Sequence, residues 1–356
     1  PTTAIVSYHE DGSSVTVQIP QANLPVRVPI ATVFGPDAEL DDIWANRQNE
    51  ITAKAIKVTC KDDITLYGAS IRLKSADAFM SLPVDVLTGR YIVLAYPNGF
   101  DAIGQDTYDT PSEFAVIAIE DGTTIRLTSP ANINGRAART PFTVQLDSGQ
   151  VFFGQARLGL QQDVSGTEIS ANKPVAVYAG VKRTSIPVSV GNYRDHIVEQ
   201  MPPLEAWGTE AIVTPHYPVT PASTERAVVR VLSAFDNTNW TLDGTPQPPL
   251  MAGRSVEFAL TKAMPLIADG PVLVAQYEHS VNSILSNGES GLGDPFMMLI
   301  PPPQQFDSVY SFQCVDHPEF IRHFVNIVIP SNATASVRID GKPVTEPFAA
   351  IAGTRF

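Results

Sequence analysis

The sequence predicts an all-β protein built from tandem β-sandwich-like repeats of about 100 to 120 residues each. Proline and glycine, with 30 and 23 of 356 residues, interrupt the chain too often for long helices. Between them, polar turns lead into short runs of alternating apolar and polar residues, the pattern of strands buried on one face. Three sequence markers of this kind recur along the chain, which indicates one β unit used more than once.

The first marker is a polar turn followed by an alternating strand. Its copies are EDGSSVTVQI from Glu10, EDGTTIRLT from Glu120, FDNTNWTLDG from Phe235 and SNATASVRIDG from Ser331. The Asp, Asn and Gly residues of these turns tolerate the left-handed backbone that tight hairpins need. In the third copy Trp240 stands where the second copy has Ile125, so we expect Trp240 in the core.

The second marker is an apolar strand that opens on proline, here called the Pro-Val strand. EISANKPVAVYAG aligns with PLIADGPVLVAQY, which places Pro174 over Pro271. Proline lacks a backbone N–H and is tolerated at the first residue of a strand. NEITAKAIKV, from Asn49, is a relative of this marker without the proline.

The third marker is a proline turn that leads through a glycine into a strand. It occurs as LPVDVLTGRYIVLAYP and as MPPLEAWGTEAIVTPHYP. Pro83 and Pro202 are 119 residues apart, and so are Gly89 and Gly208. A further copy, LIPPPQQFDSVYSF, keeps the prolines and the aromatic strand but lacks the glycine. Equal spacing of two separate residue pairs supports an internal repeat.

These markers divide the chain into four parts. Residues 81–200 and 201–299 carry all three markers and are predicted to be complete β units. Residues 1–80 carry only the later half of a unit, and residues 300–356 carry only the earlier half. The two halves either belong to incomplete units or come together in space as one composite unit.

The composition argues against several classes of partner. Lys and Arg number 24 against 37 Asp and Glu, so the net charge is −13 at pH 7. This charge repels nucleic-acid phosphates and anionic membrane surfaces. No apolar run approaches the roughly 18 residues of a membrane-spanning helix. We therefore expect neither a nucleic-acid partner nor membrane insertion.

The two cysteines leave their redox state open. Cys60 and Cys314 either pair across the length of the chain or both stay free. Two thiols at this spacing match no zinc or redox motif.

The stretch DHIVEQMPPLEAWG, residues 195–208, comes nearest to a catalytic set. A carboxylate beside an imidazole can tune a general base, as Asp195 and His196 would, with Glu199 as the acid. Neighbours on a strand point to opposite faces, however, so Asp195 and His196 are not expected to converge. The sequence also lacks a nucleophile elbow and a zinc-type histidine pair. We interpret the stretch as a linker that fixes one unit against the next, and we predict no catalytic residues.

Clustered aspartates make calcium the candidate metal. The loop DAIGQDTYD brings Asp101, Asp106 and Asp109 together, and calcium binds clustered oxygens in extracellular modules. The spacing departs from the EF-hand pattern, so solvated turn acids are the alternative interpretation. No other cofactor is expected.

Two tryptophans are candidate binding residues for a protein or glycan ligand. Trp44 stands in a long unrepeated segment, where a loop anchor is the alternative, and Trp207 stands at the unit boundary. Asp195 and His196 complete this candidate binding set because they lie in the same boundary stretch.

Several motifs together resemble one protein family. In chain order they are GTEISANKPVAVYAG, DHIVEQMPPLEAWGTEAIVTP, PVLVAQY, DPFMMLIPPPQQF and FVNIVIPSNATASVRIDGKPV, and they are similar to the IgGFc-binding protein family, in particular to its bacterial-type members. The resemblance implies a secreted or surface-displayed β-rich module from large extracellular proteins with mucin-like or adhesive roles, and no enzyme activity. Family members often carry a cysteine just before Asp195. Here Arg194 stands there, so a disulfide staple is missing, and the antibody binding of the family name is not carried over.

We predict a non-enzymatic extracellular or cell-surface module for binding and adhesion. Rigid β units would hold variable loops at fixed spacing, so that weak contacts add through multivalency. Edge strands offer a route to self-association by β-augmentation. One alternative is a structural subunit of an extracellular fibre or matrix, in which half units complete those of neighbouring chains. Another is a carbohydrate-active hydrolase that uses Glu199 and Glu205 about 5 to 9.5 Å apart.

Overall fold

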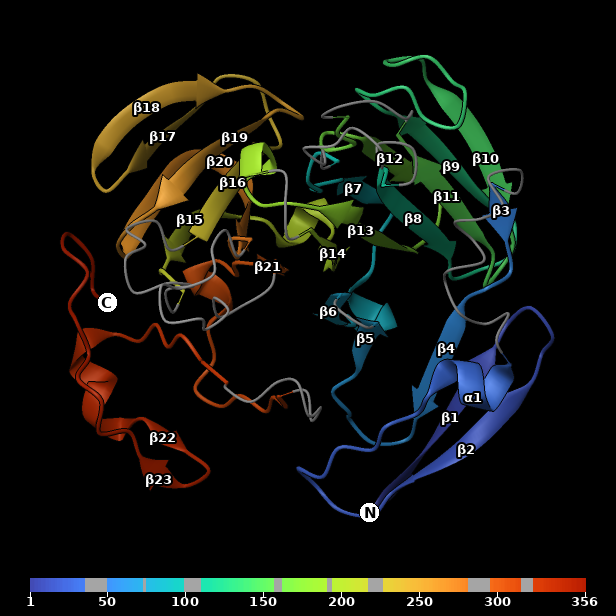
Figure 1. Ribbon diagram of the computed structural model, residues 1–356, viewed down its shortest axis with the longest axis horizontal. Coiled ribbons are helices and arrows are strands. Elements are labelled where there is room, and N and C mark those ends of the chain that lie inside the picture. Colours follow the sequence, from blue (N-terminus) through green and yellow to red (C-terminus); the bar gives the residue numbers. More distant parts are fainter. Residues whose placement is uncertain are drawn as a thin grey trace.

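A computed structural model describes residues 1–35, 50–72, 75–98, 110–156, 162–190, 194–216, 227–280, 295–314 and 323–356. In these ranges β-strands dominate, and the helical residues are confined to α1 (Ile30–Phe34) and short 3-10 turns. The predicted all-β class is therefore confirmed. Two β bodies lie side by side across the top of Figure 1, with the N-terminal sheet and the C-terminal hairpin below them.

The strands of residues 81–200, with β3 from the N-terminal part of the chain, form two sheets around one core. One sheet has the order β10-β9-β12-β7, and the other has the order β14-β13-β8-β11-β3. Buried and exposed side chains alternate along β9 as the sequence predicts: Ile125 and Leu127 are fully buried, and Arg126 between them is exposed. The bounds are β3 (Ile51–Thr52), β7 (Arg90–Ile92), β8 (Ser112–Ala118), β9 (Thr123–Thr128), β10 (Phe142–Leu146), β11 (Val151–Gln155), β12 (Glu168–Ala171), β13 (Val175–Thr184) and β14 (Asp195–Met201).

The same order of pairing recurs in residues 201–299. The bounds are β15 (Gly208–Val213), β16 (Ala227–Ser233), β17 (Thr238–Leu242), β18 (Thr245–Leu250), β19 (Ser255–Leu260), β20 (Met264–Tyr277) and β21 (Met297–Leu299). The long β20 takes the places of both β12 and β13: its first half pairs with β15 and β17, and its second half pairs with β16 and β21. Trp240, 6% exposed, lies in the core of this part, which confirms its expected place.

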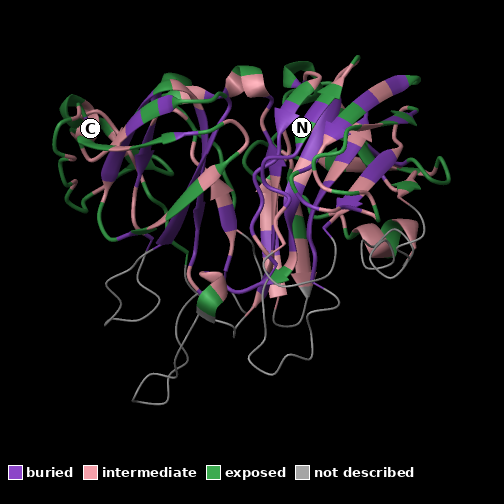
Figure 2. Cartoon of the chain, turned by 90° about the horizontal axis from the view of Figure 1, so that it is seen from above, coloured by how far each residue is buried: buried purple, intermediate pink, exposed green. Residues whose placement is uncertain are grey.

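The two β bodies share a hydrophobic core. One continuous cluster of buried side chains contains Val177 and Ile197 together with Val228, Leu232 and Tyr277. Figure 2 shows buried residues running through the strands of both bodies. Packing therefore crosses the predicted boundary at residue 200, and the division into separate repeat domains stays a prediction.

Type I′ hairpins explain the Asp-Gly pairs of the first marker. Asp243 and Gly244 have φ angles of 50° and 74°, and Asp340 and Gly341 have φ angles of 50° and 76°. Two consecutive residues with positive φ match the right-handed twist of the flanking strands. These turns join β17 to β18, and β22 (Arg338–Ile339) to β23 (Lys342–Pro343).

The N-terminal residues form a separate sheet with the order β2-β1-β4, and α1 packs on it. The bounds are β1 (Thr2–Tyr8), β2 (Ser14–Ile19) and β4 (Ile56–Cys60), and a hairpin of β5 (Tyr67–Arg72) and β6 (Ser75–Met80) follows. Residues 1–80 and 300–356 touch where Ser311 donates a hydrogen bond of 3.2 Å to Asn23. In the described part of the chain no strand pairing joins these two regions, and the composite unit stays a prediction.

Candidate functional site

Residues 195–208 lie where three chain segments meet. β14 pairs with β13 inside the first β body, the hairpin strand β6 packs against β14, and β21 of the second body approaches the same point. Two buried aspartates, Asp77 on β6 and Asp195 on β14, are 8% and 0% exposed. The predicted linker is thus an internal junction, here called the acidic junction (Asp77, Asp195 and Glu199).

Asp77 connects the hairpin to both β bodies. Its carboxylate accepts hydrogen bonds from the backbone N–H of Val198 at 2.9 Å and from that of Met297 at 3.5 Å. The hairpin also contacts β14 through Ser75, whose hydroxyl group donates a hydrogen bond to Asp195. A buried carboxylate that accepts backbone N–H groups satisfies donors at strand ends, so these contacts fix the relative position of β6, β14 and β21.

The acidic junction perturbs the pKa of its own members. Burial raises the pKa of Asp77 well above its usual range, and the negative charge of Asp195 adds to the increase. Burial also raises the pKa of Glu199, with the charge of Asp77 as the second cause. Carboxyl groups with raised pKa values can indicate a functional site or a structural network. Here their hydrogen bonds connect parts of the fold.

The side chains of the predicted catalytic set point to different partners. His196 Nδ1 lies 3.0 Å from the carbonyl oxygen of Val181 on β13, whereas Asp195 contacts Ser75. Glu199 faces Asp77. Glu205, the other carboxylate of the hydrolase hypothesis, accepts a hydrogen bond from Thr88 and lies 3.7 Å from Arg90. These contacts give the hydrolase hypothesis no support.

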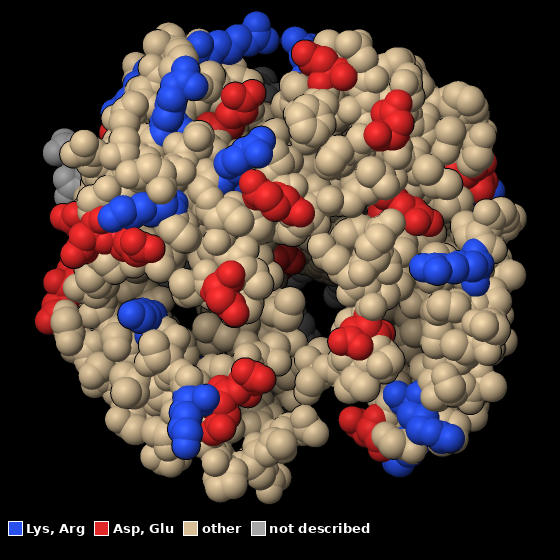
Figure 3. Space-filling view, turned by 180° about the vertical axis from the view of Figure 1, so that it is seen from behind, with Lys and Arg blue, Asp and Glu red and all other residues tan. Residues whose placement is uncertain are grey.

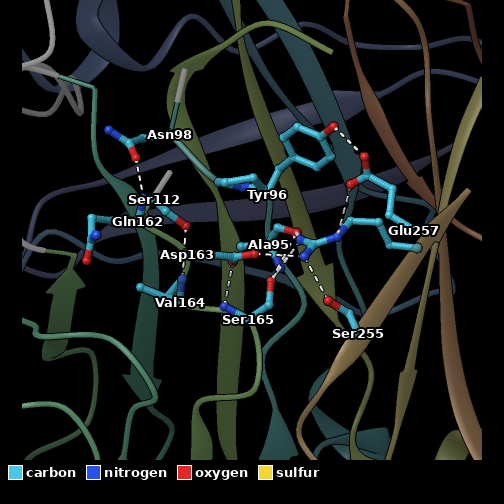
Figure 4. A network of polar contacts seen from close by, with 12 residues as sticks. Ala95, Tyr96, Asn98, Ser112, Gln162, Asp163, Val164, Ser165, Ser255 and Glu257 are labelled. Atoms are coloured by element: carbon cyan, nitrogen blue, oxygen red, sulfur yellow. Dashed lines mark hydrogen bonds and ion pairs between the residues drawn. The ribbon is translucent and has the colours of Figure 1, made fainter. Parts of the chain in front are cut away.

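A second polar network, centred on Arg230, joins the two β bodies (Figure 4). Arg230 extends from β16, and Nη1 donates to the carbonyl oxygen of Ala95 at 2.6 Å. Nη2 donates to Asp163 and to Ser255, both at 2.7 Å. Glu257 of β19 lies 3.5 Å from Nε. Ala95 and Asp163 belong to the first body, and Arg230, Ser255 and Glu257 belong to the second.

Two tyrosines, Tyr96 and Tyr277, pack around this network. The network of Arg230, Ala95, Asp163, Ser255 and Glu257 is here called the Arg230 lock. The guanidinium carbon of Arg230 lies over the ring of Tyr96, 5.4 Å from its centroid. The Tyr96 hydroxyl group donates a hydrogen bond to Glu257. Tyr277 donates to the carbonyl oxygen of Ala95 at 3.0 Å. Burial raises the pKa of both tyrosines, and carboxylates nearby contribute. Burial is the largest influence on the pKa of Arg230 and lowers it, but the charge and hydrogen bond of Asp163, together with Tyr277 and Glu257, outweigh burial and the pKa is raised.

A known protein family matches most of this chain, including both polar networks. The family model described as IgGFc binding protein matches residues 77–356, which contain Asp77, Arg230 and the whole acidic junction. The chain belongs to the IgGFc-binding protein family. It is 25% identical to the human IgGFc-binding protein over 350 residues, which cover 97% of this chain and 6% of the human protein. No solved structure matches the chain.

In this IgGFc-binding family member one candidate binding residue is enclosed by the core. Trp207 is 8% exposed, packs in the core that both bodies share, and directs its indole N–H at the carbonyl oxygen of Pro202, 3.4 Å away. His196 is half-buried at the same junction. Trp44 and the calcium candidates Asp101, Asp106 and Asp109 lie outside the described residues.

The described residues were compared with the requirements of a metal site, a disulfide and a membrane-spanning helix. In the ranges given above, no three His, Cys, Asp or Glu side chains group in a way that could hold a metal ion. Cys60 and Cys314 are both free thiols. Among the described residues no helix has the length and apolar character to cross a membrane.

Charge on the back face of this family member is mixed (Figure 3). Figure 3 shows acidic and basic side chains interspersed over the back face of the molecule, with acidic groups around its central hollow.

Sequence reasoning missed the Arg230 lock, although a signal was present. Arg230 is the only charged residue in AVVRVLS, a strand that is buried along its whole length. Arginine is almost never buried unless it is paired, so a charge in such a run predicts a buried partner. Identification of Asp163 as that partner needs the fold, because 67 residues separate the two in sequence.

Buried carboxyl groups lead us to expect greater stability in mild acid than in weak base. Burial raises the pKa of Asp77, Glu113 and Glu199 well above the usual range. Because the folded state then holds the proton more tightly than the unfolded chain, this stabilisation is complete below the unfolded pKa and is lost as the pH rises through the folded pKa. We expect Tm to fall as the pH rises from about 5 to about 8, measured by circular dichroism.

Glu113→Gln provides the control for this pH dependence. Glu113 is 4% exposed on β8, and Gln155 donates to it at 3.3 Å, an interaction that the isosteric amide can keep. We expect the variant to gain on the order of 1 kcal/mol at pH 8 and almost nothing near pH 4. Equal changes in stability at both pH values would show that Glu113 does not titrate in this range.

Proposed function

We propose that this chain is a non-enzymatic binding module of an extracellular protein and acts in adhesion through contacts with other proteins. Membership of the IgGFc-binding protein family supports binding as the activity. The human relative carries binding to the Fc part of IgG in its name, and this chain corresponds to 6% of that protein. Fc is therefore the first ligand to test, and other extracellular proteins and glycans follow.

The Arg230 lock is the observation that carries the proposal. Multivalent recognition gains affinity when the contact surfaces keep a fixed separation, because the second contact then forms at a high effective concentration. A buried arginine that bonds to both β bodies, together with a shared core, holds their surfaces in one arrangement. Loops on such a scaffold present a pre-organised surface and lose little conformational entropy on binding.

Binding to immobilised chain tests the proposal. We would immobilise the chain at low and at high density and measure binding of the IgG Fc fragment, a panel of purified extracellular proteins and a glycan array. We expect saturable binding of at least one protein, with slower dissociation at high density because of multivalency. Heat-unfolded chain at the same density is the control.

Two results would count against this function. Absence of binding to every protein and glycan tested would favour the alternative of a structural subunit. Release of reducing sugars from an oligosaccharide panel by the purified chain would instead favour the hydrolase. Calcium binding by Asp101, Asp106 and Asp109 is a separate proposal, which calorimetric titration of the chain with calcium would test.

A further inference from the structure

Two spacings relate the C-terminal residues to the Arg230 lock. Arg230 stands six residues before Asp236, the aspartate in the third copy of the polar turn. Asn326 stands six residues before Asn332, which has the same place in the fourth copy. Counted from the polar turns, Asn326 is therefore the counterpart of Arg230.

Asn326 contacts the second β body, below which the C-terminal residues lie in Figure 1. Its side-chain amide donates a hydrogen bond to the Thr214 hydroxyl oxygen at 3.0 Å and another to the carbonyl oxygen of Pro215 at 3.1 Å. The carbonyl oxygen of Thr214 lies 3.4 Å from the same nitrogen. Thr214 and Pro215 directly follow β15, so Asn326 reaches the second body where that strand ends.

The acceptors in the two contacts also match. Arg230 donates to the carbonyl oxygen of Ala95, which stands six residues after Gly89 of the third marker. Thr214 stands six residues after Gly208, the glycine in the next copy of that marker. Both donors thus have one position relative to the polar turn, and both acceptors have one position relative to the glycine. Agreement of two independent spacings is typical of a contact that recurs between repeated units.

We propose that Asn326 forms a second copy of the joint that Arg230 forms, and that this second joint opens before the first. The contact of Asn326 with Thr214 and Pro215 is here called the Asn326 joint. It holds residues 323–356 on the second body, as Arg230 holds the second body on the first. In repeat proteins each unit contacts its neighbours through interfaces of one kind. The joint goes beyond the proposed binding function, because loops of the two β bodies can bind a ligand without any movement of the C-terminal residues.

The chemistry of the two joints explains the order of opening. Arg230 is 7% exposed and has the Asp163 carboxylate as a charged partner at 2.7 Å. Asn326 is exposed, and its amide and the acceptors of that amide are uncharged. Hydrogen bonds of ionised groups are about twice as strong as neutral ones, and water competes for an exposed amide. The Asn326 joint therefore costs less to break, which is typical of a segment that opens locally in a folded protein.

Phe356 provides a second attachment for the C-terminal residues. It is 5% exposed, and its ring centroid lies 5.8 Å from that of Phe306. Phe306 directly follows the proline turn that packs on β15. Residues 323–330 can thus leave the second body while Phe356 keeps the last residues attached, so the opening is a hinge movement rather than a release.

The distance between two spin labels tests the hinge. Labels are attached at two exposed positions, Thr245→Cys on β18 and Lys342→Cys on β23. The two free cysteines are first removed by Cys60→Ser and Cys314→Ser. With the native joint we expect electron–electron double resonance to give one main distance. In Asn326→Ala we expect a longer distance whose population is about 3 to 30 times larger than with the native joint, the factor for the loss of one or two neutral hydrogen bonds.

Asn326→Asp separates hydrogen bonding from volume. The carboxylate keeps the size of the amide but has no proton to donate and faces carbonyl oxygens, so the longer distance should be more populated than in Asn326→Ala. Asn332→Ala, at an exposed asparagine of the same region, is the matched control and should give the native distance. All these variants should keep the main Tm within about 2 °C, because the replaced side chains are exposed.

Two results would overturn the proposal. One is the native distance in Asn326→Asp, because the side chain would then act only through its volume. The other is a fall of the main Tm by more than about 5 °C in Asn326→Ala, because the C-terminal residues would then unfold together with the second body and have no joint of their own. No ligand is present in these measurements, so their outcome is independent of the proposed binding function.

Discussion

Replacement of Arg230 by methionine is expected to lower the free energy of unfolding by about 3 to 5 kcal/mol, the usual effect of removing one partner from a buried ion pair. The variant leaves the Asp163 carboxylate without its charged partner, with only the backbone N–H of Ser165 as a donor, and leaves the carbonyl oxygen of Ala95 with one donor fewer. Methionine fills much of the same volume, so the loss is mainly electrostatic. Equilibrium denaturation in urea, followed by tryptophan fluorescence, measures it.

Arg90→Met is the matched control for this experiment. Arg90 lies 3.7 Å from Glu205, but the two side chains are 62% and 47% exposed. Exposed ion pairs contribute about 0 to 1 kcal/mol, so the control should unfold close to the native midpoint. If Arg230→Met cost no more than Arg90→Met, the Arg230 lock would contribute nothing to the joining of the two bodies.

The sequence markers were informative because each has a local physical cause. The equal spacing of Gly89 and Gly208 reflects close packing: a Cβ at Gly89 would lie 2.3 Å from the carbonyl oxygen of Ala171, and one at Gly208 would lie 2.3 Å from Pro302. The Asp-Gly pairs mark positive φ angles, and the strand alternation marks a buried face. Such causes act within a few residues or at one repeated position, so sequence reasoning detects them.

Long-range polar contacts could not be predicted in the same way. Asp77 and Val198 are 121 residues apart, and nothing in DAFM marks this aspartate as buried. Glu50 belongs to the predicted N-terminal half unit, yet it forms a bidentate pair with Arg136 at 2.6 and 2.8 Å, next to the pairing of β3 with β11. The N-terminal residues thus contribute a strand to the first β body, which repeat spacing alone does not reveal.

The second large effect is expected for Trp207→Ala, which should cost about 3 to 5 kcal/mol. Trp207, a predicted candidate for ligand binding, is 8% exposed and packs in the core that both bodies share. Loss of the indole leaves a cavity at the point where the proline turn leads into β15, and the shared core can collapse only partly around it. Thermal and urea unfolding of the variant measure the cost.

Trp207→Phe separates packing from recognition. Phenylalanine keeps most of the apolar volume and loses only the indole N–H, whose distance of 3.4 Å to Pro202 indicates a weak hydrogen bond. We therefore expect Trp207→Phe to lose less than half as much stability as Trp207→Ala, and to keep ligand binding. A surface tryptophan that contacts a ligand behaves in the opposite way, because its replacement by alanine leaves Tm unchanged and removes binding. Retention of the native Tm by Trp207→Ala, with loss of binding, would therefore favour recognition over packing as the role of Trp207.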